Sequence, residues 1–212
     1  MSILVDLIFP RICFGCEKIG NYLCKKCREE KIIVNSIDNH FAKNFEGRLS
    51  IFKYKGIIKE AIACLKYEMV TDVAEELVDY MVEILKTHFP NLVKYWINNN
   101  FVLIPVPLHQ YRQNWRGFNQ SELLGEMLAE KLGLSFNSKF VERIVYSESQ
   151  VIQKHKKDRV NKMENYFKLN NEEISKNKRY IIFDDVITTG STTLNVGKTI
   201  GQGIFFALSV AG

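Results

Sequence analysis

Residues 180–193, YIIFDDVITTGSTT, decide how the rest of this 212-residue chain is interpreted. The apolar run 180–183 predicts a buried strand, and Asp184 and Asp185 follow at its carboxyl end. A Thr-Gly-Ser-Thr sequence then precedes a short helix that begins at about residue 192. Open α/β sheets bind ligands beyond the carboxyl ends of their strands, and helix N-termini present free amides to phosphate.

The turn after the strand is rich in hydroxyl groups, which add hydrogen-bond donors for a phosphate. Gly190 allows the backbone to approach a ligand closely. The two carboxylates stand one short loop away, where a sugar attached to that phosphate would place its hydroxyls. The alternative is an ordinary strand–loop–helix with two solvated acids and a capping threonine. We predict a ribose-phosphate cradle made of Asp184, Asp185, Thr188, Thr189, Gly190, Ser191 and Thr192.

Strand and helix patterns alternate on either side of this segment. Predicted strands cover 49–54, 101–106, 140–146, 180–183 and 204–210, and predicted helices cover 57–67, 72–89 and 121–132, with Pro90 ending the second helix. The continuous apolar run 101–106 is typical of a strand that is covered on both faces. The order of elements predicts a mainly parallel central α/β sheet flanked by helices.

Composition excludes several classes of protein. Hydrophobic residues make up 46% of the chain and charged residues 25%, which are ordinary values for a globular protein. No apolar run reaches the roughly 18–20 residues that span a bilayer, so no membrane insertion is expected. Asp6 and Pro10 interrupt the short apolar start, which argues against a signal peptide and for a cytoplasmic location. The net charge of +5 is compatible with a polyanionic partner without demanding one.

Four of the five cysteines lie close together, in the pattern C-x2-C-x7-C-x2-C. Cytoplasmic thiols stay reduced, and two CxxC pairs at this spacing suit a tetrahedral structural Zn²⁺ site; two disulfides are the alternative. Cys64 falls within the apolar pattern of a helix and is expected in the core. We predict a zinc-binding unit over 1–30, a linker over 31–48 and the α/β domain over 49–212. The zinc ligands are Cys13, Cys16, Cys24 and Cys27.

A second predicted strand also ends in a segment with candidate ligand-binding residues. Strand 101–106 leads into a basic loop that contains Gly117 and again opens a helix, so it predicts a second anion site. The alternative is that its arginines are merely solvated. Trp115 and Phe118 in this loop either pack it against the domain or stack on a nucleobase, and packing is favoured.

These motifs resemble a known family. FDDVITTGST is similar to the phosphoribosyl-pyrophosphate motif of type I phosphoribosyltransferases. The cysteine unit, Leu65-Lys66-Tyr67, the run IPVPLHQYRQNWRGFNQSELL at 104–124 and the string from Gln150 to Phe167 resemble the ComF family, a competence branch of that fold. The resemblance covers nearly the whole chain.

The resemblance implies that the chain binds phosphoribosyl pyrophosphate with Mg²⁺. Asp184 and Asp185 would then hold the ribose hydroxyls and stabilise the cationic sugar carbon, and Mg²⁺ would bridge the pyrophosphate oxygens. The similar loop after the first core strand holds pyrophosphate in that family, which makes Arg112, Arg116 and Gly117 candidates. The similar mobile loop supplies a cation that closes on the leaving group, and Arg159 is the corresponding candidate, catalytic together with Asp184 and Asp185.

The family's link to natural transformation also implies a role in DNA uptake, with single-stranded DNA and competence-machinery proteins as partners. The most basic stretch, 150–168, is a candidate DNA strip, with a solvated basic helix as its alternative. Its candidate residues are Lys154, Lys156, Lys157, Arg159 and Lys162.

Three functions therefore remain open. The first is a ligand-binding protein of DNA uptake, the second an active phosphoribosyltransferase of nucleotide metabolism with an unknown acceptor, and the third a zinc-stapled interaction module with a relic site. A hybrid of the first two, in which both activities exist, is favoured. The sequence departs from the family at its end, GKTIGQGIFFALSVAG, where the usual loop after the last strand is short. That loop is therefore not expected to contribute to acceptor binding.

Overall fold

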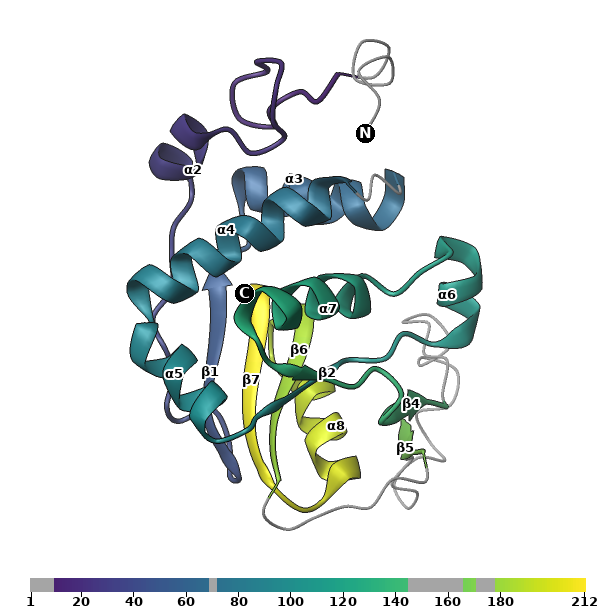
Figure 1. Ribbon diagram of the computed structural model, residues 1–212. Helices are drawn as coiled ribbons and strands as arrows, with labels where there is room; N and C mark the ends of the chain where they lie inside the picture. Colours follow the sequence, from purple (N-terminus) through teal and green to yellow (C-terminus); the bar gives the residue numbers. More distant parts are fainter. Residues whose placement is uncertain (1–9, 69–71, 145–165, 171–177) are drawn as a thin grey trace.

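The structure is a computed structural model that describes residues 10–68, 72–144, 166–170 and 178–212. In these ranges a parallel five-stranded sheet, in the order β1-β7-β6-β2-β3, forms the centre of the molecule (Figure 1). Its strands are β1 (Phe45–Phe52), β2 (Val102–Pro105), β3 (Ser135–Phe136), β6 (Arg179–Val186) and β7 (Ile204–Ala211). The predicted parallel α/β class is confirmed.

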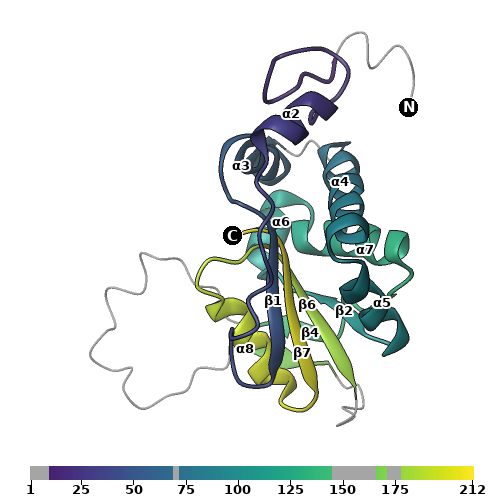
Figure 2. The same cartoon turned by 90° about the vertical axis from the view of Figure 1, so that its left-hand side faces the viewer.

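Helices cover both faces of this sheet (Figure 2). One face carries α4 (Asp72–His88), α5 (Pro90–Asn98) and α7 (Gln120–Leu132), and the other carries α8 (Ser191–Ile200). The remaining helical elements are α2 (Lys25–Lys31), α3 (Gly56–Ala63), the π-helix η1 (Cys64–Glu68) and α6 (Gln110–Arg116).

The central strand β6 shows why this sheet must be covered twice. Successive side chains of a strand point to opposite faces. Ile181 and Phe183 pack into the core under α4 and α7, whereas Tyr180 and Ile182 pack into the core under α8. All four are almost fully buried. The run Tyr180–Phe183 is therefore apolar throughout rather than alternating.

Several predicted boundaries were wrong. Strand β1 begins at Phe45, inside the range assigned to a linker, and residues 34–38 pair with its edge. Pro90 does not only end α4; it is the first residue of α5, since proline suits the first turn of a helix. The segment predicted as a strand over 140–146 contributes β4 (Val141–Arg143), which pairs antiparallel with β5 (Phe167–Leu169) outside the main sheet.

The strand at the site is also longer than its apolar run. It was predicted to end at Phe183, but β6 continues to Val186. Asp184 and Asp185 are therefore held within the sheet, where Asp184 pairs in register with Ser209 of β7. The two carboxylates take their positions from the ladder of β6 rather than from a loop.

Helix α7 lies close to the sheet because Gly125 has no side chain. A Cβ atom there would stand 3.0 Å from Leu103 Cδ2 and 3.1 Å from a ring carbon of Phe183.

We predict that Gly125→Val, which needs more room still, destabilises the fold by about 1–3 kcal/mol through overpacking. Thermal unfolding measures this change. The matched control is Glu126→Val, at the exposed neighbouring position, which should cost only a few tenths of a kcal/mol. Equal losses for the two variants would contradict the close packing of α7.

Candidate functional site

The two adjacent carboxylates of β6 are bound by groups from three different elements. Ser121 Oγ, in the first turn of α7, donates a hydrogen bond of 2.9 Å to Asp184 Oδ1 and accepts one of 3.2 Å from the backbone N–H of Asp185. The same N–H lies 2.9 Å from Asp184 Oδ1. Asn119 caps α7 by accepting from the Ser121 N–H, and its amide donates to the carbonyl of Val106 after β2. These bonds fix the start of α7 against the ends of β2 and β6.

Lys66 completes this network on the other side. Its Nζ lies 2.5 Å from Asp185 Oδ2, and the two side chains are only 20% and 12% exposed. Lys66 lies on the π-helix η1, and such irregular turns often occur at functional sites. The next residue, Tyr67, lies beneath the guanidinium of Arg116, whose Cζ stands 5.3 Å from the ring centroid. The π-helix therefore contacts both regions that the sequence predicts to bind anions.

The environment of Asp184 favours the protonated acid. Burial raises the pKa of Asp184 to about 7, and the adjacent Asp185 carboxylate adds to the rise. Hydrogen bonds from Ser121 and from the Asp185 N–H, together with the charge of Lys66, oppose it. A carboxyl with this pKa changes its charge near neutral pH, which is frequent at functional sites.

The hydroxyl-rich turn after β6 is open to solvent. Thr188, Thr189 and Ser191 are exposed, whereas Gly190 is buried at the N-cap of α8 with a φ of 77°. A Cβ at Gly190 would stand 2.3 Å from the ring of Phe41, so both the backbone conformation and the space require glycine. The Ser191 N–H and the Thr189 hydroxyl lie 3.4 Å apart.

A small cavity joins the turn to the carboxylates. It has a volume of about 30 Å³, and both Asp184 and residues 186–193 line it. This space holds about one water molecule or one ligand oxygen. The structure thus brings the predicted cradle residues together, except that Asp185 contacts Lys66 rather than this cavity.

The second predicted anion site is a helix rather than a loop. Arg116, at the end of α6, is only 9% exposed, and its NH1 donates to Gln120 Oε1 at 3.1 Å. Its buried Nε has no hydrogen-bond partner within the described part of the chain. Gly117 ends α6 with a φ of 78°. Arg116 is therefore a buried cation with an unused donor, which contradicts a merely solvated arginine.

The other residues predicted for this second anion site differ in whether they pack against the domain. Trp115 is 62% exposed, so the prediction that it packs against the domain was wrong. Phe118 does pack against the core. The backbone of Arg112 belongs to α6, while its side chain lies outside the description. The candidate DNA strip also falls outside the described residues, so the structure does not test Lys154, Lys156, Lys157, Arg159 or Lys162.

The sequence reasoning missed three contributors to the site. Ser121, Lys66 and Gln120 contact the predicted residues, yet the sequence presents each of them only within a longer motif. The signal that could have found them is their place in the motifs LKY and RGFNQS, which carried the family resemblance.

The four N-terminal cysteines form one cluster. Their Sγ atoms all lie within 4.8 Å of one another, and those of Cys16 and Cys24 are 3.7 Å apart. A tetrahedral site with Zn–S bonds of about 2.3 Å separates its sulfurs by about 3.8 Å, so the cluster could hold zinc. A Cβ at Gly15 would stand 2.7 Å from Cys27 Sγ, so glycine is required beside this ligand. Cys64 is buried elsewhere in the core, as predicted.

Ionisation of these thiols is unequal. Burial opposes ionisation of Cys13, but hydrogen bonds from the backbone N–H groups of Cys24, Gly15 and Cys16 outweigh it and lower its pKa to about 6. Burial and hydrogen bonds with the other three cysteines raise the pKa of Cys27 to about 12. Backbone donors thus already favour one thiolate, the form that ligates a metal.

The cysteine unit packs onto the α/β domain at the end toward which the strands point (Figure 1). The N–H of Leu23 donates to Glu76 Oε2 at 2.9 Å, and Arg28 lies over the ring of Tyr80 at 4.8 Å. Cys13, Leu23 and Cys27 share one hydrophobic cluster with α3 and α4. The unit is therefore part of the main core rather than a separate appendage.

The fold and site define an α/β protein with a parallel sheet, an acid pair on its central strand and a four-cysteine cluster. No family model matches the chain. It is 37% identical over 102 residues to Competence protein F of Haemophilus influenzae, a match that covers 46% of this chain and 43% of that protein. It is 35% identical over 100 residues to the DNA utilization protein YhgH of Salmonella typhi, covering 46% and 42%. It is 24% identical over 131 residues to the competence protein ComFC of Bacillus subtilis, covering 56% and 51%.

These relatives support the resemblance to the ComF family that the motifs indicate. The matches span about half the length, or less, of the relatives themselves. Within the described residues, every helix is too short or too polar to cross a membrane.

We predict that the purified protein contains about one zinc per chain and that Cys16→Ser loses most of it. Chelation should lower the melting temperature, because metal binding contributes folding free energy to so small a unit. Elemental analysis and thermal unfolding measure both effects. Cys64→Ser is the control, since Cys64 lies outside the cluster and its variant should keep the metal. Protein without zinc and without free thiols would instead indicate two disulfides.

The raised pKa of Asp184 predicts how the stability of the fold changes with pH. The unfolded carboxyl ionises near pH 4 and the folded one near pH 7, so the stability that Asp184 contributes is present below pH 4 and is lost as the pH rises to 7. The melting temperature of Asp184→Asn minus that of the wild type should therefore increase from pH 4 to 7, by about 2–4 °C per kcal/mol, and stay level above pH 7. Asp79→Asn, at an exposed ion pair with Lys131, is the control. A difference for Asp184→Asn that is constant with pH would show that its carboxyl ionises normally.

Proposed function

We propose that this protein binds phosphoribosyl pyrophosphate with Mg²⁺ and acts in DNA uptake, where it also binds single-stranded DNA. The observation that carries the first part is the joint position of Asp184 and the exposed turn 188–192 around one small cavity. The second part is supported by relatives whose names are competence protein and DNA utilization protein.

The proposed ligand would contact three elements of the structure. The turn and the N-terminus of α8 suit the 5-phosphate, because amides and hydroxyls converge there. Asp184 and Asp185 suit the ribose hydroxyls, which donate hydrogen bonds to carboxylates. Arg116, at the end of α6 after the neighbouring strand β2, suits the pyrophosphate, since a guanidinium matches phosphate oxygens and its Nε has no hydrogen-bond partner among the described residues.

Lys66 would reduce the repulsion between this polyanionic ligand and the acid pair. Two adjacent carboxylates repel a polyanion, and the ammonium of Lys66 offsets the charge of Asp185. Mg²⁺, bound through the pyrophosphate oxygens, would neutralise the remaining charge and polarise the leaving group. The residues present fit such a complex, because β6 carries oxygen ligands and the buried cation Arg116 lies in the segment that follows the adjacent strand β2.

The alternative is an active phosphoribosyltransferase of nucleotide metabolism with an unknown acceptor and no DNA role. The raised pKa of Asp184 favours this alternative, because a carboxyl that titrates near neutral pH can accept a proton during a reaction. Release of pyrophosphate from the bound ligand on addition of an acceptor would distinguish turnover from binding alone.

We predict that calorimetry detects binding of phosphoribosyl pyrophosphate with Mg²⁺ to the wild type. The double variant Asp184→Asn/Asp185→Asn should bind at least about tenfold more weakly, because hydrogen bonds to charged groups contribute about 1.5–3 kcal/mol each. Asp79→Asn, the same change at a remote exposed pair, should stay within about twofold. Undetectable binding to the wild type at millimolar ligand would contradict the proposal.

The DNA proposal has its own prediction. Replacing Lys154, Lys156 and Lys157 by Ala should weaken single-stranded DNA binding and reduce the salt dependence. The slope of log K against log salt concentration should fall by up to about 2, since each phosphate contact contributes about 0.7. A salt titration of binding measures this slope. The control replaces the exposed Lys59, Lys94 and Lys139 by Ala, with the same loss of charge. Equal effects of the two triple variants would place the DNA surface elsewhere.

A further inference from the structure

Three exposed aromatic side chains lie on the two elements next to the buried Arg116. Trp115 and Tyr111 on α6 are 62% and 63% exposed, and Tyr67 on η1 is 61% exposed. Helix α6 lies at the edge of the molecule, away from the helices that cover the sheet (Figure 1). Large apolar side chains that are exposed singly need no explanation, whereas a group of them indicates a binding surface.

The guanidinium of Arg116 brings two of these rings together from different elements. Its Cζ stands 5.3 Å from the ring centroid of Tyr67 and 6.0 Å from that of Trp115. Tyr111 precedes Trp115 by four residues on α6, a spacing that places two side chains on the same face of a helix. The three residues therefore form one surface across η1 and α6, which we call the aromatic surface.

Arg116 also holds this surface in place. Its side chain is buried, and its NH1 donates to Gln120 Oε1 at 3.1 Å. The attraction between a guanidinium and an aromatic ring stabilises Tyr67 and Trp115 in their positions beside it. Rings that are already ordered lose little conformational entropy when a ligand binds, so the surface is prepared for binding.

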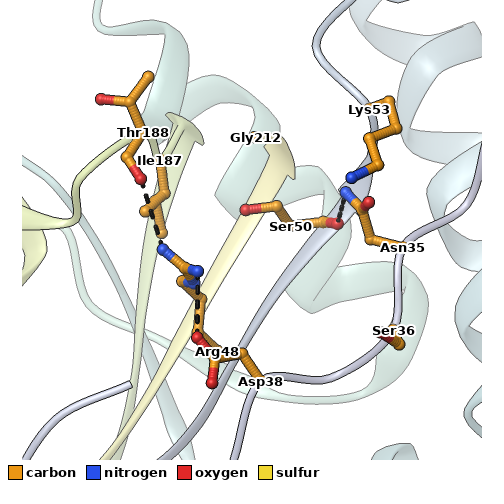
Figure 3. A pocket seen from close by; sticks show the side chains of 9 residues that line it. All are labelled: Asn35, Ser36, Asp38, Arg48, Ser50, Lys53, Ile187, Thr188 and Gly212. Atoms are coloured by element: carbon orange, nitrogen blue, oxygen red, sulfur yellow. Dashed lines mark hydrogen bonds and ion pairs between the residues drawn. The ribbon is translucent and has the colours of Figure 1, made fainter. Parts of the chain in front are cut away.

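The charge of Arg116 is available to a ligand, unlike that of Arg48, which also lies over an aromatic ring. Arg48 NH2 lies 3.0 Å from Asp38 Oδ2, and its NH1 donates to the carbonyl of Thr188 at 3.4 Å (Figure 3). The fold therefore offsets the charge of Arg48. In the described ranges no acidic side chain forms an ion pair with Arg116, and α6 contains a second arginine and no acid. The aromatic surface is therefore positively charged.

Exposed rings beside an uncompensated positive charge suit single-stranded nucleic acid. Every base has a flat face that stacks on an aromatic side chain, and every nucleotide carries a negative phosphate that an arginine attracts. The bases of a duplex are already paired and stacked, so these rings would have access to them only in a single strand. The surface thus fits a single strand better than a duplex.

We infer that the aromatic surface stacks with unpaired bases of single-stranded DNA. The inference rests on the DNA part of the proposed function and adds a second kind of contact to it. The candidate strip within 150–168 would neutralise phosphates, whereas the rings would bind bases. The exposure of Trp115 excludes the packing role expected for it and leaves stacking on a nucleobase, the alternative that the sequence indicated.

Trp115 itself reports on this contact. The chain has two tryptophans, and the other, Trp96, is fully buried in the core. Binding of an oligothymidylate to the full chain should therefore quench the fluorescence of Trp115, because the indole ring would stack on a base. In Trp115→Leu, the remaining fluorescence of Trp96 should not change when the oligothymidylate is added.

The affinity for the same oligothymidylate gives a second measurement. Trp115→Leu should weaken binding at least about fivefold, and Trp115→Phe, which keeps an aromatic ring, should stay within about twofold of the wild type. Neither variant changes a charge, so the slope of log K against log salt concentration should stay the same. Tyr54→Leu, at an exposed tyrosine outside the aromatic surface, is the control and should bind like the wild type.

The outcomes separate this inference from the proposed function. A wild type that does not bind single-stranded DNA contradicts the DNA part of the proposed function and, with it, the inference. A wild type that binds the strand without quenching of Trp115, or as tightly as Trp115→Leu does, overturns the aromatic surface alone. Equal losses in Trp115→Leu and Trp115→Phe would also overturn stacking. Quenching in the wild type, with a loss of affinity in Trp115→Leu only, supports both hypotheses.

Discussion

The hydrogen bond from Ser121 to Asp184 is the contact on which the arrangement of the site depends. It links the first turn of α7 to the carboxyl end of the central strand β6. Two adjacent carboxylates lie there in a partly buried position. Such a pair is costly unless each acid has a partner. Ser121 supports Asp184, and Lys66 supports Asp185. Both helical elements therefore have to approach β6 closely, and Gly125 allows α7 to do so.

The cysteine cluster and the acid pair are connected through the same part of the structure. The cluster packs on α3 and α4, and α3 continues directly into the π-helix that carries Lys66 and Tyr67. Gly15, beside the sulfur of Cys27, also lies close to Ile57 at the start of α3. A metal at the cysteines would therefore stabilise the element from which Lys66 reaches Asp185. The cysteine unit is therefore held against the α/β domain by packing on α3 and α4.

The sequence predicted the sheet and the grouping of Asp184 with the hydroxyl-rich turn because those features depend on local patterns. The apolar run 180–183 and the hydroxyl-rich turn are visible in a single short segment, and the structure brings Asp184 and residues 188–192 together as expected. The contacts of Lys66 and Ser121 were not predictable, because they join residues 119 and 63 positions apart in the chain. The range assigned to a linker was partly wrong for a related reason: residues 34–38 mix polar and apolar side chains without a clear strand pattern, yet they pair with the edge of β1. The end of β6 was misplaced since acidic residues rarely continue a strand, and here neighbouring strands override that preference.

In the proposed function, the acid pair and the turn bind one activated pentose together. A crystal structure with phosphoribosyl pyrophosphate and Mg²⁺ tests it most directly. We expect density for the 5-phosphate at residues 188–192, with the ribose hydroxyls against Asp184 and Asp185 and the pyrophosphate toward Arg116. Ligand density elsewhere on the molecule, with this turn empty at saturating ligand, would contradict it.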